Sequence, residues 1–132
     1  ENRRISPLPE ALFMPVVVTR PREELHMAIE RRVDAMIATG LESEVRRLVD
    51  KYGRQAPGLN SIGYNEWFGK FDGEAGTAET REAIVIHTRQ YAKRQETWLR
   101  RRPGPPLFNL AEPEQRAAVF NNIAEFSANF AL

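Results

Sequence analysis

A long amphipathic helix is the sequence feature that most constrains the fold. We predict it from Thr77, as its N-cap, to Arg102, after which a cluster of prolines ends it. Apolar and aromatic residues recur on one face of its second half, which begins at His87, and we expect this face to be buried. The face starts one turn earlier, at Ile84, and continues through Thr88, Tyr91, Ala92, Gln95 and Leu99, with Trp98 at its edge.

Basic residues line both flanks of this face. The segment from Arg81 to Arg102 carries seven Lys or Arg residues but only two acidic ones, although the formal net charge of the whole chain is +1. Charges on a helix most often form a solvated face. The alternative is a nucleic-acid surface, because cations bind phosphate oxygens and the amides of Gln90 and Gln95 suit base edges.

The remaining pattern predicts a mainly α-helical chain with one or two short strands. Residues 1–13 are expected to be a linker, and 14–132 to be the folded part. The β-branched run at 14–19 is typical of a strand covered on both faces of a parallel sheet, with neighbours supplied by a longer protein or a partner. Further elements are a strand at 107–110, a loop at 54–60, and helices at 21–39, at 41–52, around Trp67 and at 113–130.

Arg32 stands out in the helix at 21–39. It falls almost at the centre of the apolar face, seven residues after Leu25 and four before Met36. An unpaired buried cation is costly, so Arg32 needs a partner. Either an ion pair or a snorkelling side chain meets this need, or Arg32 belongs to an anion site.

Two smaller features also have structural interpretations. Gly63 either allows a ligand to approach the backbone closely or serves a turn. Glu42 and Glu44 begin the helix at 41–52, where capping and solvation explain them better than catalysis does.

Composition excludes several classes of protein. The chain has no cysteine and only two histidines, which excludes disulfides and thiolate sites and argues against a dedicated zinc or iron site. It contains no phosphate loop, no dinucleotide-binding glycine motif and no zinc-protease motif. No apolar run is long enough to cross a membrane, so we expect a cytoplasmic protein. The polar start without an initiator Met leads us to expect a piece of a longer protein.

Four stretches of the sequence resemble the C-terminal part of the tRNA dimethylallyltransferase family, also called tRNA isopentenyltransferases. Together they cover about residues 14 to 110, and their order and spacing are highly specific. They are 16–19 with the helix entry Arg-Glu-Glu-Leu that follows, 29–45, Ser-Ile-Gly-Tyr at 61–64, and 88–100, which includes Tyr-Ala-Lys-Arg-Gln-Glu-Thr-Trp-Leu-Arg.

The resemblance implies an enzyme that transfers a dimethylallyl group from dimethylallyl diphosphate to the exocyclic amine of the adenosine 3′ of the anticodon. Members of the family have a P-loop-type α/β core and bind the diphosphate with a phosphate loop and a magnesium ion. This chain lacks that loop and the catalytic aspartate. We therefore expect a C-terminal fragment that is inactive alone and partners its own N-terminal half, with most magnesium contacts outside it.

Residue by residue, the resemblance assigns Arg32 to the diphosphate as a catalytic residue. It assigns two segments to the tRNA anticodon stem-loop. Asn60 and Asn65 stand where some relatives carry basic residues. The residues of the two tRNA-contact segments are Ser61, Ile62, Gly63, Tyr64, Asn65, His87, Thr88, Arg89, Gln90, Tyr91, Ala92, Lys93 and Arg94.

Two rival hypotheses remain. One is a stand-alone RNA-binding module without enzymatic activity, and the other is a helical unit that only docks onto its N-terminal half.

Overall fold

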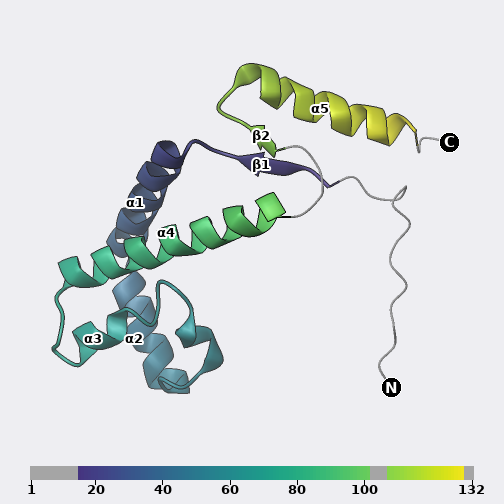
Figure 1. Cartoon of the computed structure of the whole chain (residues 1–132). Coiled ribbons are helices and arrows are strands. Elements are labelled where there is room, and N and C mark those ends of the chain that lie inside the picture. Colours follow the sequence, from purple (N-terminus) through teal and green to yellow (C-terminus); the bar gives the residue numbers. More distant parts are fainter. Residues whose placement is uncertain (1–14, 102–106, 130–132) are drawn as a thin grey trace, which may run out of the picture. The chain divides into compact units, whose positions relative to one another are not determined.

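The computed structural model describes residues 15–101 and 107–129, which are mainly helical with two short strands, as predicted (Figure 1). The predicted linker at 1–13 lies outside the described residues, as do Arg102 and the prolines after it. The elements are β1 (Val17–Thr19), α1 (Arg22–Ala38), α2 (Leu41–Tyr52), the 3-10 helix η2 (Pro57–Asn60), α3 (Trp67–Phe71), α4 (Thr77–Arg101), β2 (Leu107–Asn109) and α5 (Pro113–Ala128).

The chain divides into two compact units, and the predicted functional segments all fall in one of them. The helical unit comprises residues 22–98. The strand unit comprises 1–21 and 99–132, of which 15–21, 99–101 and 107–129 are described. The predicted helix at 41–52 agrees with α2, whereas part of the loop predicted at 54–60 is η2. Here Pro57 provides the N-terminal residue that suits a helical turn.

In the strand unit, β1 and β2 pair in parallel, with Val17 opposite Leu107 and Thr19 opposite Asn109. The Leu110 N–H extends the ladder by donating to the Thr19 carbonyl at 3.3 Å. The predicted parallel arrangement is confirmed, and one neighbour of β1 comes from this chain. Val18 is half exposed among the described residues. Burial of this strand on both faces stays a prediction, because its remaining neighbours were expected from a longer protein or a partner.

α5 contacts β2 and buries Val119. Phe120 and Ile123 of the same helix are exposed within the described part of the chain. Among the described residues, the neighbours of α5 cover only a narrow stripe of this helix around Val119, and both exposed side chains lie outside that stripe. Phe130, the last residue of the helix predicted at 113–130, lies outside the described residues.

The core of the helical unit gathers residues from every helix between 22 and 98. Trp67 is completely buried and stacks on Phe71 with ring centroids 6.4 Å apart. Because α3 has only five residues, tertiary burial of Trp67 rather than helix propensity holds this element in place. The buried cluster consists of Ile29, Val33, Leu41, Val45, Leu59, Trp67, Ile84 and Val85.

The predicted burial along the second half of α4 is only partly confirmed: Thr88, Ala92 and Leu99 are half-buried. It is wrong for Tyr91, Gln95 and Trp98, which are exposed. The fully buried residues of α4 are Thr80, Ile84 and Val85, all in its first half. Farther along, Tyr91 and Trp98 are 49% and 54% exposed. The apolar face continues in the predicted direction, but among the described residues the hydrophobic core reaches α4 only as far as Ala92. The face therefore leaves the core before the helix ends.

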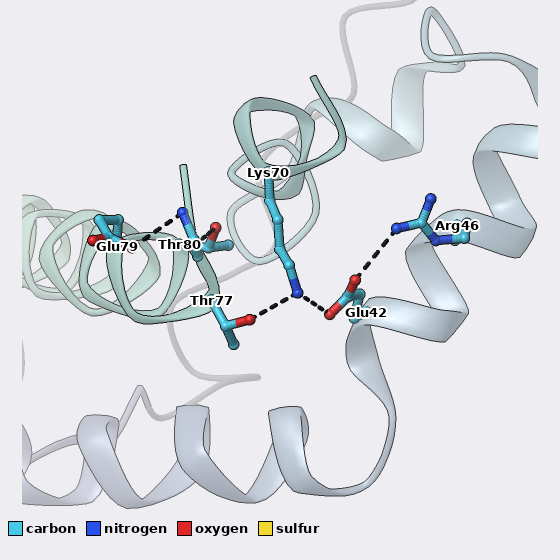
Figure 2. A network of polar contacts seen from close by, with 7 residues as sticks. Glu42, Arg46, Lys70, Thr77, Glu79 and Thr80 are labelled. Carbon is cyan, nitrogen blue, oxygen red and sulfur yellow. Dashed lines mark hydrogen bonds and ion pairs between the residues drawn. The ribbon is translucent and has the colours of Figure 1, made fainter. Parts of the chain in front are cut away.

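A polar network fixes the start of α4 against α2 and α3 (Figure 2). The ammonium group of Lys70 donates to the Glu42 carboxylate and, at 2.7 Å, to the Thr77 hydroxyl. Arg46 approaches the other oxygen of Glu42 at 3.3 Å. Capping and solvation were predicted to explain Glu42, but it is half-buried and joins α2 to α3.

The first turn of α4 is also closed differently from the prediction. The carboxylate of Glu79 accepts the Gly76 N–H at 3.0 Å, and the Thr80 hydroxyl donates to the Gly76 carbonyl at 2.9 Å (Figure 2). Glu79 thus satisfies a backbone donor that precedes the helix, as the acidic residue of a capping box does. The hydroxyl of Thr77, expected to cap the helix, instead accepts the proton of Lys70.

The Glu42 contacts predict a loss of stability in acid. The hydrogen bond from Lys70, assisted by that from Arg46, lowers the pKa of Glu42 in the folded protein. A lowered folded pKa adds stability above the ordinary value of about 4.3, and this stability disappears as the pH falls through the lowered pKa. Between about pH 6 and pH 3, we expect the unfolding temperature of wild type to fall more steeply than that of Glu42→Gln.

The measurement is thermal unfolding followed by circular dichroism at stepped pH. Glu24→Gln, which removes an exposed carboxylate from the first turn of α1, is the control. Parallel pH profiles for wild type and Glu42→Gln would contradict this role for Glu42.

Candidate functional site

The two segments assigned to RNA lie in the helical unit, one in the turn at 61–65 and one on α4 at 87–94. The turn follows η2 and leads into α3, so the buried Leu59 and Trp67 anchor it on either side. Ser61 supports it internally, because its hydroxyl donates to the Gly58 carbonyl at 2.7 Å. Its own carbonyl accepts the Tyr64 N–H at 3.1 Å.

Gly63 serves the turn. Its φ of +98° lies in the left-handed region, which side-chain-bearing residues adopt only with strain. A Cβ at this position would meet no atom within 4 Å, so backbone conformation and not crowding within this chain requires glycine. Of the two interpretations of Gly63, the structure supports the turn.

Glu66 connects the turn to α4, and sequence reasoning missed it. One carboxylate oxygen accepts the Gly63 N–H at 2.8 Å, and the other lies 2.7 Å from His87 Nδ1. The Glu66 side chain is only 2% exposed, whereas that of His87 is 47% exposed. The spacing of Glu66, one residue beyond the turn and 21 before His87, carries no periodic signal that could have revealed the contact.

Glu44 holds the turn from a second side. Its carboxylate accepts the Tyr64 hydroxyl at 2.6 Å, which raises the pKa of Tyr64 because the charged acceptor favours the protonated phenol. Glu44 was predicted to be a solvated residue at a helix start. It is half-buried instead, and it fixes the last aromatic ring before α3.

On α4 the predicted RNA-contact residues separate into two groups. Thr88 donates its hydroxyl to the Ile84 carbonyl at 2.7 Å, and Ala92 packs against the core, so both serve the fold. The guanidinium of Arg94 lies 5.6 Å from the centre of the Tyr91 ring, an arrangement in which cation and ring attract each other. The exposed group consists of His87, Gln90, Tyr91, Lys93 and Arg94.

Arg89 also takes part in the fold, and its assignment to RNA stays a prediction. It donates to Glu30 of α1, and its side chain is half-buried. Two turns nearer the start of α4, Arg81 forms a two-pronged pair with Asp34, with Nε–Oδ1 at 2.5 Å and Nη2–Oδ2 at 3.0 Å. This hydrogen-bonded pair lowers the pKa of Asp34 and raises that of Arg81. Acidic residues of α1 therefore neutralise two of the cations counted in the basic flanks.

The prediction that Arg32 lies on the buried face of α1 is wrong, because its side chain is exposed. The buried residues of α1 are Ile29 and Val33, and at 100° per residue their common direction lies about a quarter-turn from Arg32. The prediction located the face by Leu25 and Met36, and both lie on the side of Ile29 and Val33 that is nearer to Arg32. An exposed guanidinium needs no buried partner, but it is accessible to an anion.

Metal and membrane sites find no support in the part of the chain that the structure describes. No group of three or more His, Asp or Glu residues there is arranged to hold a metal ion. None of the described helices combines the length and apolar character that crossing a membrane requires.

Comparison with known proteins assigns the class. A model of the IPP transferase family matches residues 2–102, so the class is a family of transferases. The chain is therefore a member of this family, as the four sequence stretches predicted. It is 42% identical over 107 residues to the tRNA dimethylallyltransferase of Shouchella clausii (strain KSM-K16), a match covering 81% of this chain and 34% of that protein.

Solved structures confirm the predicted fold class. The tRNA delta(2)-isopentenylpyrophosphate transferase of Staphylococcus epidermidis matches with a TM-score of 0.76 and 27% identity, covering 86% of this chain and 37% of that one. The tRNA isopentenylpyrophosphate transferase of Bacillus halodurans matches with a TM-score of 0.75 and 31% identity, covering 84% and 38%. The chain thus spans about a third of the length of the relatives it matches.

The positive φ of Gly63 predicts a specific cost of substitution. Gly63→Ala forces a Cβ into the left-handed region, and we expect it to lower the free energy of unfolding by about 1 to 2 kcal/mol. Gly58→Ala is the matched control, because its φ lies outside the left-handed region and its added Cβ also meets open space. We expect it to be neutral or slightly stabilising. Urea unfolding measures both, and equal losses would contradict the backbone explanation.

Proposed function

We propose that the protein containing this chain is a tRNA dimethylallyltransferase. It transfers the dimethylallyl group of dimethylallyl diphosphate to the exocyclic amine of the adenosine 3′ of the anticodon. The amine nitrogen attacks the allylic carbon, the carbon–oxygen bond to diphosphate breaks, and the nitrogen loses a proton. Membership of the family and 42% identity to a tRNA dimethylallyltransferase support this assignment.

This chain contributes an RNA-facing surface to the enzyme. The single observation that carries the proposal is the group of exposed side chains on α4 beside a turn held to the same helix by Glu66. Lys93 and Arg94 supply phosphate-binding cations, while Tyr91 offers a ring on which an unpaired base can stack. From the turn, the exposed Ser61, Ile62 and Asn65 add polar and apolar contacts.

Arg32 is proposed to contact the diphosphate. Its exposure on α1 leaves the guanidinium able to form the paired hydrogen bonds that phosphate oxygens accept. Charge grows on the diphosphate as the allylic bond breaks, so a cation there stabilises the transition state more than the ground state.

The remaining catalytic groups lie outside this chain in our proposal. The sequence contains no phosphate loop. Magnesium is proposed to be bound mainly by the rest of the protein, and none of the described residues is assigned to that ion. The chain alone makes contacts to RNA but does not transfer the prenyl group. The rest of the protein supplies the loop, the metal ligands and the base that activates the amine.

RNA binding by α4 can be tested with Lys93→Ala in the complete gene product. The probe is a tRNA anticodon stem-loop, and the measurement is its affinity across a series of salt concentrations. Loss of one phosphate contact should weaken binding roughly threefold or more and reduce the salt slope by about 0.7 to 0.9. Lys51→Ala, which removes an exposed cation from α2, should change neither the affinity nor the salt slope. Identical slopes for wild type and Lys93→Ala would contradict the proposed surface.

The diphosphate role of Arg32 can be tested by single-turnover transfer of the dimethylallyl group to tRNA. We expect Arg32→Ala to slow the reaction about tenfold or more while tRNA affinity stays within about twofold of wild type. The exposed neighbour Arg31, changed to alanine, is the control. A rate within about threefold of wild type, or about 0.7 kcal/mol, would refute the role. Wild type that binds tRNA but never transfers the group would instead favour the non-enzymatic RNA-binding module.

A further inference from the structure

Glu66 is an almost fully buried carboxylate whose two oxygens contact different segments of the chain. One oxygen accepts the Gly63 N–H at 2.8 Å and the other lies 2.7 Å from His87 Nδ1. Burying an ionised carboxylate is costly unless both oxygens find partners. The backbone donor and the imidazole supply them, so the position of the carboxylate is tied to that of the turn and of α4.

The contact with Glu66 also fixes the orientation of the His87 imidazole ring. A carboxylate oxygen of Glu66 lies 2.7 Å from His87 Nδ1, so this contact occupies one of the two polar atoms of the ring. Nε2 is then the remaining polar atom of a side chain that is 47% exposed. Rotation of the ring would break the bond to Glu66. The imidazole is therefore held in one orientation on the face of α4 that also carries the exposed Gln90 and Arg94.

The turn is held at two points that are chemically independent. Glu44 accepts the Tyr64 hydroxyl from α2, and Glu66 accepts the Gly63 N–H from the entry to α3. Of these two carboxylates only Glu66 also reaches α4. Removing it would leave the turn attached through Tyr64 but no longer coupled to His87 through a shared acceptor.

We infer that Glu66 is a positioning residue for RNA binding, whose carboxylate couples the turn at 61–65 to His87 and holds both in one arrangement before RNA arrives. This inference rests on the proposed function, in which both segments contact tRNA. A surface that is already ordered loses less conformational freedom on binding, so preorganisation raises affinity without adding a contact. Loss of the coupling transfers that ordering cost to the binding step.

The test compares three variants of Glu66 in the complete gene product, with a tRNA anticodon stem-loop as the probe. Glu66→Ala should weaken binding about tenfold, because the turn and His87 must then be ordered during binding. Glu66→Asp keeps the charge but is one methylene too short to span both partners, so it should weaken binding similarly. Glu66→Gln should stay within about threefold of wild type, because its amide oxygen can accept from Gly63 and its NH2 can donate to a neutral Nδ1.

A double-mutant cycle separates positioning from general destabilisation. If Glu66 acts through His87, the combined loss in Glu66→Ala/His87→Ala should fall short of the product of the single losses by about threefold or more. Asp72→Ala, which breaks the exposed Arg54–Asp72 pair in the same part of the chain, should leave affinity within about twofold of wild type. Melting temperatures identify any variant that fails to fold; if Glu66→Ala does, Glu66→Asp replaces it in the comparison and the cycle.

The outcomes distinguish this inference from the proposed function. Wild type that does not bind the stem-loop would refute the proposed function and, with it, the purpose assigned to Glu66. If wild type binds, three results would overturn the positioning role alone: unchanged affinity in Glu66→Ala and Glu66→Asp, a loss in Glu66→Gln as large as that in the alanine variant, or single losses that simply multiply in the cycle.

Discussion

Burial of Trp67 is the interaction on which the helical unit depends. The indole lies in a five-residue helix that is too short to be stable by itself, and it is enclosed by apolar residues from α1, α2, η2 and α4. Lys70, on the same short helix, places its ammonium group 5.3 Å from the indole ring and reaches Glu42 and Thr77. One buried side chain thus fixes both the position of α3 and the start of the long helix.

The ion pairs around this core determine which cations remain available for a ligand. Arg81 and Arg89 are used by Asp34 and Glu30, which hold α1 against α4. Lys93 and Arg94 follow one turn later, are exposed, and lie where the apolar core no longer reaches α4. A helix that begins as a core element therefore continues as a surface element, with the same periodicity along its whole length.

The same division between core and surface residues is found in both segments that are assigned to RNA. Both combine residues that face solvent with residues that serve the fold: Gly63 is buried in the turn, and Ala92 packs on the core. Glu66 lies between them and contacts both. In the proposed enzyme, the RNA surface is thus an extension of the hydrophobic core, held by buried polar groups and not by loops alone.

The sequence by itself determined the helices, the parallel relation of the strands and the family, because capping residues, helical periodicity and ordered motifs are local along the chain. The match between residues 41–52 and α2 shows how far such signals reach. The exposure of Arg32, Tyr91 and Trp98, the pairing of Arg89 with Glu30, and the bridge through Glu66 were decided only by the tertiary structure. Periodicity gives the direction of a face, but burial and pairing depend on where neighbouring helices end and which distant side chains they bring within hydrogen-bonding distance.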